Sequence, residues 1–258
     1  MGPPGVGKSY MAQVLSEILF PGYDALLTLD MTEFGGAHSG EHARFRLIGP
    51  PPPYVGWEAG GVLTNHVLRY PVSVVLIDEF EKACDEARNV LLKIFDEGVI
   101  QDGRGRTISF RGIYFILTAN AGRKLWRKVR RITLNPKEET SRRKGEELED
   151  EELRELLLNE GFAPELLSRI SYIVMFNRLE EEHLQEIARR RLMTLRDNAL
   201  REDFLLIEYD ENLLSRWLVQ RSAAQNDCRR LTSAFERLIE TPLARWRLQR
   251  EGNREIKN

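Results

Sequence analysis

The chain has 258 residues, which is enough to bury a sizeable core in one large domain or two smaller ones. Its net charge is only −2, so overall charge selects neither a nucleic acid nor an acidic protein as partner. The apolar run at residues 72–77 is too short to span a membrane, and Cys84 and Cys228 are too far apart for a zinc motif.

The first two thirds of the sequence alternate between strand and helix patterns. In chain order these patterns predict a helix at residues 9–20, a strand at 25–30, a helix at 62–69, a strand at 72–77, a helix at 79–97, a hairpin at 99–110 with its turn at 102–105, and strands at 113–118 and 172–176. Strands that alternate with helices favour a parallel α/β sheet. Residues 123–155 are highly charged and are expected to form a surface excursion, partly helical at best.

The pattern becomes mostly helical after residue 177. It predicts helices at 180–197 and 210–220, a lone strand at 204–209, and a last helix that starts at Asp227. Thr241 and Pro242 are expected to break this last helix and to cap a short continuation of it. We therefore expect two domains, a large α/β domain at residues 1–177 and a small, mostly helical α+β domain at residues 178–258.

The stretch "GPPGVGKS" near the start of the chain fits the pattern of a phosphate-binding loop, G-x-x-x-x-G-K-[ST]. Its residues are Gly2, Pro3, Pro4, Gly5, Val6, Gly7, Lys8 and Ser9. Glycines let backbone N–H groups wrap a phosphate, and the helix that follows adds its N-terminal dipole. We expect Lys8 to neutralise the β and γ phosphates of ATP and the Ser9 hydroxyl to bind Mg²⁺. The alternative is a glycine-rich turn at a helix start.

Two buried strands end in polar residues that would serve this loop. The run "VVLIDE" ends in Asp78 and Glu79, at the edge of the sheet where ligands of α/β proteins bind. We expect Asp78 to hold Mg²⁺ through water and Glu79 to polarise the attacking water as a general base. The run "ILTAN" brings Asn120 to the same edge, where its amide would orient that water. The alternatives are that the two acids only begin a helix and that Asn120 lies in an ordinary turn.

The stretch "RLIGPPPPYVGWEAGGVLTNHVLRYPVSVVLIDEFEKA" resembles the AAA+ unfoldases of the Clp and heat-shock disaggregase family, in particular their second, C-terminal ATPase module. Four shorter stretches match the same module in the same order: "DGRGRTISFRG", "LTAN", "FAPELLSRI" and "IETPLAR". The resemblance covers nearly the whole chain apart from residues 123–155 and the last dozen residues. It implies a parallel AAA+ sheet flanked by helices, followed by a small lid domain.

The resemblance also implies a substrate-gripping pore loop at Tyr54, Val55 and Gly56. An exposed aromatic ring can hold any polypeptide by apolar contact without reading its sequence. The alternative is a tyrosine that packs on its neighbour in a proline-rich loop. Pro53 stands where relatives usually carry glycine, and its fixed φ would stiffen the loop.

Two arginine roles follow from the same resemblance. Arg169, in "LLSRI", matches the arginine finger that reaches the nucleotide of the adjacent subunit, and the alternative is an arginine that bonds helix carbonyls. Arg229 matches the sensor arginine of the small domain through the register of "IETPLAR", and its neighbour Arg230 is the alternative. The Tyr-Gly-Ala-Arg type of run that usually leads into this arginine is replaced by "AQNDCR".

The sheet of this family has five parallel strands, and its central strand feeds the phosphate-binding loop. Here that loop begins at residue 2, and the chain supplies the other four strands. We therefore expect the first central strand to be missing and the chain to be a fragment of a longer protein.

Together these features predict the ATPase module of a stress-response chaperone. It would bind ATP and Mg²⁺, form a homo-oligomeric ring, expected to be a hexamer, and thread unfolded or aggregated proteins through a central pore. We expect a cytoplasmic location, no membrane partner, and no docking to the Clp peptidase, because residues 121–162 lack an Ile-Gly-Phe or Ile-Gly-Leu tripeptide.

Two rival functions remain open at this stage. One is a nucleic-acid-associated AAA+ motor or loader, suggested by the basic run at residues 123–131. We do not expect nucleic-acid binding, because the acidic run at residues 146–155 would neutralise that patch. The other rival is a truncated ring subunit that docks without hydrolysing ATP.

Overall fold

The fold is described from a computed structural model of the protein, which describes residues 1–35, 40–121, 150–222 and 227–255. The basic run at residues 123–131 lies outside these residues. The chain divides into two compact units. The first unit contains Met1–Pro3 and Lys8–Phe176, and the second contains Pro4–Gly7 and Asn177–Asn258. Within the described part of the chain, no helix is long and apolar enough to cross a membrane.

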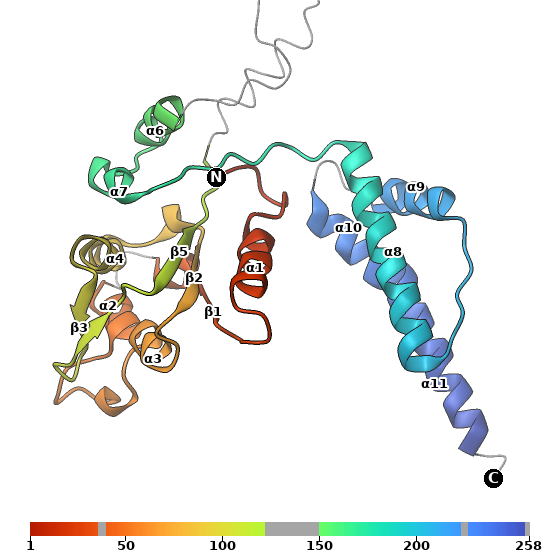
Figure 1. The fold of residues 1–258 in the computed structure, drawn as a ribbon, viewed down its shortest axis with the longest axis horizontal. Helices are drawn as coiled ribbons and strands as arrows, with labels where there is room; N and C mark the ends of the chain where they lie inside the picture. Colours follow the sequence, from red (N-terminus) through yellow and green to blue (C-terminus); the bar gives the residue numbers. More distant parts are fainter. Residues whose placement is uncertain (36–39, 122–149, 223–226, 256–258) are drawn as a thin grey trace, which may run out of the picture. The chain divides into compact units, whose positions relative to one another are not determined.

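A parallel sheet forms the centre of the first unit (Figure 1). Its strands β1 (Leu26–Asp30), β2 (Ser73–Asp78) and β5 (Ile113–Leu117) lie in the order β1-β2-β5. The central strand β2 is apolar and buried on both faces, as expected of a strand inside a parallel sheet. Because all three strands run in the same direction, their carboxyl ends meet at one edge.

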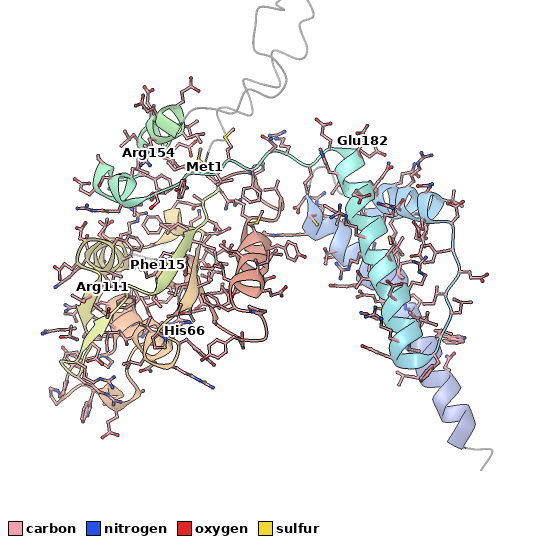
Figure 2. All side chains as sticks on the ribbon, viewed as in Figure 1. Met1, His66, Arg111, Phe115, Arg154 and Glu182 are labelled. Carbon is pink, nitrogen blue, oxygen red and sulfur yellow. The ribbon has the colours of Figure 1, made fainter. Side chains whose placement is uncertain are left out.

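A two-stranded hairpin follows helix α4 (Asp85–Glu97). Its antiparallel strands are β3 (Val99–Gln101) and β4 (Thr107–Ser109). Phe115 of β5, labelled in Figure 2, packs against two aromatic rings, with ring centroids 5.0 Å from Phe95 and 6.2 Å from Phe110. The hairpin is thereby joined to the main sheet through a shared aromatic cluster.

Helices and short 3₁₀ turns complete the first unit. They are α1 (Lys8–Leu19), η1 (Met31–Phe34), α2 (Gly40–Ile48), η2 (Trp57–Ala59), α3 (Val62–Arg69), η3 (Phe80–Lys82), α6 (Asp150–Asn159) and α7 (Pro164–Arg169). Arg154 of α6 donates to the backbone carbonyls of Leu167 and Ile170, which ties α6 to α7. The largest fully buried side chains of this unit include Met31, Phe34, Leu47, Leu63, Leu76, Ile77, Leu91 and Ile94.

The structure corrects two predictions in the first unit. The helix predicted from residue 79 begins only at Asp85, because Glu79 adopts a left-handed backbone with φ 53° and Cys84 is extended with ψ 164°. Residues 172–176 form no strand. The Met1 amino group donates to Val174 O, and Phe176 N–H donates to Met1 O at 2.8 Å. A strand needs a longer partner than one residue to build a hydrogen-bonded ladder.

The second unit is a helical bundle. Its elements are α8 (Glu181–Asp203), α9 (Glu211–Ser222), α10 (Cys228–Phe235), the π-helical turn η4 (Glu236–Glu240) and α11 (Thr241–Glu255). The core of the bundle contains Leu184, Ala188, Leu192, Leu218, Val219, Leu231 and Phe235. Arg191 of α8 lies 4.8 Å from the centre of the Phe235 ring and pairs with Glu240 at 3.4 Å, so it links α8 to the C-terminal helices.

Two predictions in the second unit are also wrong. The strand predicted at residues 204–209 does not form, and Phe204 is 90% exposed with a left-handed φ of 52°. This unit is therefore helical rather than α+β in its described residues. The last helix is not broken at Pro242 either. Thr241 N–H donates to Glu236 O five residues back, and this wider turn carries the chain into α11, where Pro242 needs no hydrogen bond.

Candidate functional site

Polar side chains from three distant segments meet at the carboxyl edge of the parallel sheet. The first segment is the start of α1, the second begins at the last residue of β2, and the third follows β5. The side chains that meet there are those of Lys8, Ser9, Asp78, Glu79, Thr118 and Asn120. We call these six residues the polar cluster. Its position follows from the parallel strand order, which brings the ends of β2 and β5 together.

Asp78 is the carboxylate at the centre of one half of the polar cluster. The Ser9 hydroxyl lies 3.0 Å from both of its oxygens, and the Thr118 hydroxyl also donates to it. Mg²⁺ prefers oxygen ligands, and a hydroxyl beside a carboxylate supplies them. The donor set therefore fits a magnesium ion held by Ser9 and Asp78.

Asn120 connects the other members of the cluster. Lys8 Nζ donates to Asn120 Oδ1 at 2.8 Å, and Asn120 Nδ2 donates to Glu79 Oε1 at 3.0 Å. Both bonds agree on which end of the amide is oxygen and which is nitrogen. A lysine, an amide and a carboxylate thus form one continuous hydrogen-bonded chain, Lys8–Asn120–Glu79.

The backbone around Glu79 is held in an unusual conformation. Glu79 N–H donates to the Thr118 hydroxyl at 3.0 Å, and Phe80 N–H donates to Thr118 O at 3.0 Å. These two bonds fix the left-handed turn at Glu79 and direct its side chain toward Asn120. The helical pattern of the sequence gives no sign of this turn. The contacts that depend on the turn therefore could not be predicted from the sequence.

Glu81 lies beside the polar cluster, and the sequence pattern did not predict a role for it. Its Oε1 accepts the backbone N–H of Asn120 at 3.1 Å. Its Oε2 is buried and has no hydrogen-bond partner among the described residues. Because Glu81 falls within a predicted helix, its sequence position does not indicate that it would accept the backbone N–H of Asn120. The only clue was its position two residues after Glu79 in an acidic run.

The backbone of the phosphate-binding loop has the conformation that glycine allows. Gly5 has φ 73° and Gly7 has φ 94°, both in the left-handed region that other residues rarely adopt. Helix α1 begins immediately afterwards at Lys8. A turn of this kind presents backbone N–H groups to an anion. The loop, Lys8 and the Ser9–Asp78 pair together have the chemistry to hold a nucleotide with its magnesium ion.

Tyr54 lies on a separate surface loop, residues 50–57, which we call the tyrosine loop. Its side chain is 51% exposed, and its ring lies 5.0 Å from that of Phe45 on α2. Val55 is fully exposed at the tip, and Gly56 has a left-handed φ of 85°. The ring therefore has one packed face, while the tip of the loop stays accessible.

Arg169 does not join the polar cluster. It lies at the end of α7 and pairs with Asp96 of α4, and about half of each side chain is exposed. The exposure leaves the guanidinium accessible from outside the first unit.

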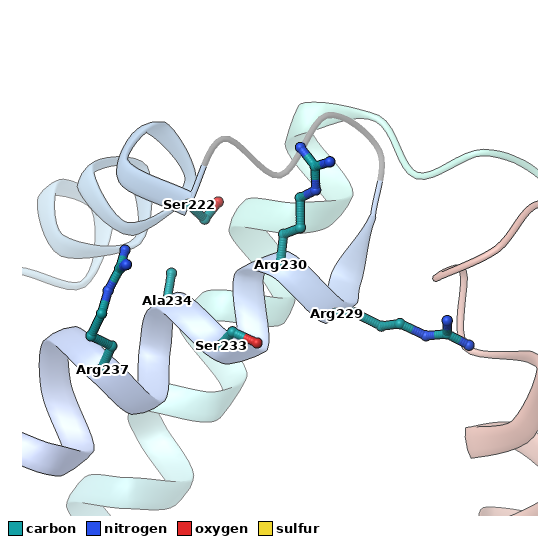
Figure 3. Close-up of a pocket in the computed structure, with 6 residues that line it drawn as sticks. All are labelled: Ser222, Arg229, Arg230, Ser233, Ala234 and Arg237. Atoms are coloured by element: carbon teal, nitrogen blue, oxygen red, sulfur yellow. The ribbon is translucent and has the colours of Figure 1, made fainter.

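Arg229 lies in the second unit, in the first turn of α10. Its backbone N–H donates to the Asp227 side chain at 2.9 Å, and Cys228 N–H donates to Gly5 O at 2.9 Å. A cavity of about 390 Å³ opens beside the helix (Figure 3). It is lined by Ser222, Arg229, Arg230, Ser233, Ala234 and Arg237. Figure 3 shows Arg229 and Arg230 leaving the helix in different directions.

Comparison with known proteins identifies related chains. The family model described as AAA domain (Cdc48 subfamily) matches residues 1–173. The chain is 34% identical over 244 residues to the negative regulator of genetic competence ClpC/MecB of Bacillus subtilis, covering 95% of this chain and 29% of that protein. It is 39% identical over 226 residues to the probable chaperone protein ClpB 1 of Chlorobaculum tepidum, covering 85% and 48%.

A similar solved structure is the closed-state cryo-EM reconstruction of Hsp104 with ATPγS and FITC casein. The TM-score is 0.75 at 27% identity, and the match covers 96% of this chain and 40% of that chain. The present chain therefore spans less than half the length of each of these relatives. The predicted AAA+ fold is confirmed. The chain belongs to the AAA family, and it is a AAA+ module of the ClpB and ClpC type.

Proposed function

We propose that this chain is the ATP-hydrolysing module of a ring-forming chaperone that unfolds protein substrates and threads them through a central pore. The observation that carries the proposal is the hydrogen-bonded chain Lys8–Asn120–Glu79, next to the Ser9–Asp78 pair. It combines a phosphate-binding cation, a water-positioning amide and a carboxylate base at one edge of one sheet. The similarity to ClpB-type chaperones supports the same function.

Each member of the polar cluster has a separate task in this proposal. Bound ATP and Mg²⁺ supply the transferable phosphate and the divalent charge that stabilises the transition state. Ser9 and Asp78 hold the cation, and Lys8 binds the β and γ phosphates. Glu79 accepts a proton from the attacking water, which Asn120 orients through its amide.

The hydrogen bonds of Lys8 indicate how nucleotide binding would reach Glu79. Lys8 Nζ donates to Gly2 O at 2.8 Å, Pro3 O at 2.7 Å and Asn120 Oδ1 at 2.8 Å, which engages the three N–H donors of an ammonium group. A phosphate oxygen that takes one of these donors must displace an acceptor. Asn120 is the side-chain acceptor of the three, so its amide is the group that can turn away and act on water beside Glu79.

Five further residues have roles in this proposal outside the polar cluster. Arg169 would reach the nucleotide of an adjacent subunit of a hexameric ring, where a charge supplied in trans stabilises the transition state. Arg229 would sense the nucleotide from the second unit. Tyr54, with Val55 and Gly56, would grip the translocating polypeptide by apolar contact.

The proposal is tested with the full protein and its Glu79→Gln variant. Removing the base should lower ATP hydrolysis by a factor of about 10² to 10⁴, while binding of a fluorescent ATP analogue is retained. Unfolding of a fluorescent protein with an unstructured tail should be lost in parallel. Glu97→Gln, at the exposed end of α4, serves as the control and should hydrolyse ATP normally.

Two outcomes would count against the proposal. Equal hydrolysis by the Glu79→Gln variant would remove Glu79 from the role of base. A full protein that assembles but does not hydrolyse ATP would instead favour a ring subunit that docks without turnover.

A further inference from the structure

We propose that Arg104, in the turn of the β3–β4 hairpin, is a positioning residue that holds the tyrosine loop in the arrangement that binds polypeptide. This inference rests on the proposed function, because it assigns to the loop the task of gripping substrate. Arg104 touches no reacting atom, and it acts only through the loop.

Arg104 contacts the residue at which the tyrosine loop ends. Its Nε–H donates to the backbone carbonyl of Trp57 at 3.4 Å, and its guanidinium carbon lies 6.0 Å from the centre of the Trp57 ring. One side chain therefore engages both the backbone and the aromatic ring of the same residue. A planar guanidinium suits this double contact better than a lysine ammonium does.

The neighbouring glycine engages the other end of the loop. Gly103 N–H donates to Ile48 O at 3.0 Å. A Cβ atom added to Gly103 would lie 2.3 Å from Pro50 O, so the two backbones approach more closely than any side chain would allow. The turn thus contacts the tyrosine loop just before Pro51 and again at Trp57.

The turn itself is rigid because Asp102 holds it from inside. The Asp102 side chain is 1% exposed and accepts hydrogen bonds from the backbone N–H groups of Arg104 at 3.0 Å and Arg106 at 2.9 Å. The Arg106 guanidinium donates to the same carboxylate at 2.7 Å. Burial alone would raise the pKa of Asp102, but Arg106 and the two N–H groups outweigh burial and lower that pKa. The charged form therefore fastens the base from which Arg104 projects.

Between its two fixed ends the loop leaves its tip accessible. Tyr54 N–H donates to Pro51 O at 3.0 Å and Trp57 N–H donates to Tyr54 O at 3.2 Å, so the tip is folded into two consecutive turns. Val55 is fully exposed and Tyr54 is half exposed. A loop with a fixed base and an exposed tip loses less conformational entropy when it binds, which raises its affinity for a flexible polypeptide.

The experiment compares Arg104→Gln, Arg104→Lys and the control Arg111→Gln in the full protein. Arg111 is an exposed arginine just after β4 and is labelled in Figure 2. If the loop of Arg104→Gln holds the binding arrangement for about a tenth of the time, the apparent KM for an unfolded polypeptide rises about tenfold. ATP hydrolysis without substrate should stay within about twofold of the unmodified protein, since the polar cluster is unchanged.

A second measurement reads the loop directly. Hydrogen exchange at the amides of Tyr54 and Trp57 should become faster in Arg104→Gln, and it should be unchanged in Arg111→Gln. Arg104→Lys keeps the charge but not the planar contact, so it should fall between the two. Unchanged exchange and unchanged KM in Arg104→Gln would overturn the proposal.

The variant Tyr54→Ala separates failure of this inference from failure of the proposed function. If Tyr54→Ala weakens polypeptide binding and Arg104→Gln does not, the loop grips substrate but Arg104 does not position it. If Tyr54→Ala itself has no effect, the gripping role of the loop is wrong. In the double variant, Arg104→Gln should add less to the defect of Tyr54→Ala than it causes alone, because both substitutions act on the same loop. Additive defects would contradict a role of Arg104 through Tyr54.

Discussion

The polar cluster and the tyrosine loop are both held by contacts between residues far apart in the chain, but the contacts differ in kind. In the polar cluster, side chains bond to side chains in two groups. Ser9 and Thr118 bond to Asp78, and Lys8 and Glu79 bond to Asn120. The tyrosine loop is held mainly through its backbone, by its own turns and by Gly103 and Arg104 of the hairpin.

The difference follows from what each region is proposed to do. Catalytic groups have to be oriented before the reaction, so polar partners hold their side chains in place. A gripping loop has to expose apolar side chains to a partner of any sequence, so only its base can be fixed. Contacts that position the loop are therefore few, and each should matter more to substrate binding than to stability.

The largest expected effect is the loss of ATP hydrolysis in Arg169→Ala. This variant tests whether the polar cluster of one chain contains every catalytic group. Arg169 lies outside it, so a strong effect of Arg169→Ala would show that the catalytic set includes a group from a second subunit. We expect hydrolysis by the full protein to fall by a factor of about 10³ or more. Asp96→Asn removes only the exposed partner of Arg169 and should change stability by less than about 1 kcal/mol.

Mixing experiments make this prediction sharper. Rings of Arg169→Ala alone and rings of Glu79→Gln alone should both be inactive. A mixture should regain some hydrolysis, because an Arg169→Ala subunit keeps its own base and receives the arginine of a Glu79→Gln neighbour. Mixed rings that assemble but remain inactive would place Arg169 outside the reaction.

A smaller effect concerns the rigidity of the hairpin turn. Asp102→Asn keeps an oxygen that can accept N–H bonds but loses the charge that binds Arg106, and we expect a loss of about 2 kcal/mol in the free energy of unfolding. Because the pKa of Asp102 is lowered in the folded state, its stabilisation is complete above the ordinary aspartate pKa of about 4. It is lost as the pH falls further, through the folded-state pKa.

Denaturant unfolding at several pH values measures the contribution of the Asp102 charge to the free energy of unfolding. The difference between the unmodified protein and Asp102→Asn should be constant near pH 7 and shrink below about pH 4. A difference that does not depend on pH would mean that the charge of Asp102 contributes nothing.

The smallest predicted effect concerns Glu81, which lies just outside the polar cluster. Glu81→Ala leaves the backbone N–H of Asn120 without its acceptor, so Asn120 is held less firmly. We expect ATP hydrolysis to fall about tenfold with nucleotide binding unchanged, as is typical when a residue that supports a functional group is removed. Glu81→Gln keeps an acceptor oxygen and should restore most of the rate. If Glu81→Gln is as slow as Glu81→Ala, the negative charge rather than the hydrogen bond is what matters.

Much of the first unit could be predicted because its signals are local. The strands β1, β2 and β5 are short apolar runs, and β2 and β5 end next to polar residues. Parallel strands share one carboxyl edge, so the sequence predicts that Asp78, Glu79 and Asn120 lie together. The structure brings them together, and the roles assigned to them remain proposals.

Other features could not be read from sequence because they depend on distant partners. Residues 172–176 and 204–209 have the apolar pattern of strands, yet a strand forms only where a neighbour completes its ladder. The contact of Arg104 with Trp57 joins residues 47 positions apart. The break between Glu79 and Asp85 was hidden because the helical period of residues 79–97 continues through it.

The left-handed backbone of Glu79 has a consequence for how this protein can change. Holding a residue other than glycine at φ 53° lowers the free energy of unfolding by about 1 kcal/mol or more compared with an ordinary backbone conformation. Asparagine tolerates this conformation better, but it lacks the carboxylate. Stability and activity therefore compete at this position. A screen for thermal resistance alone should favour asparagine or glycine here, and the resulting proteins should be harder to unfold and unable to hydrolyse ATP.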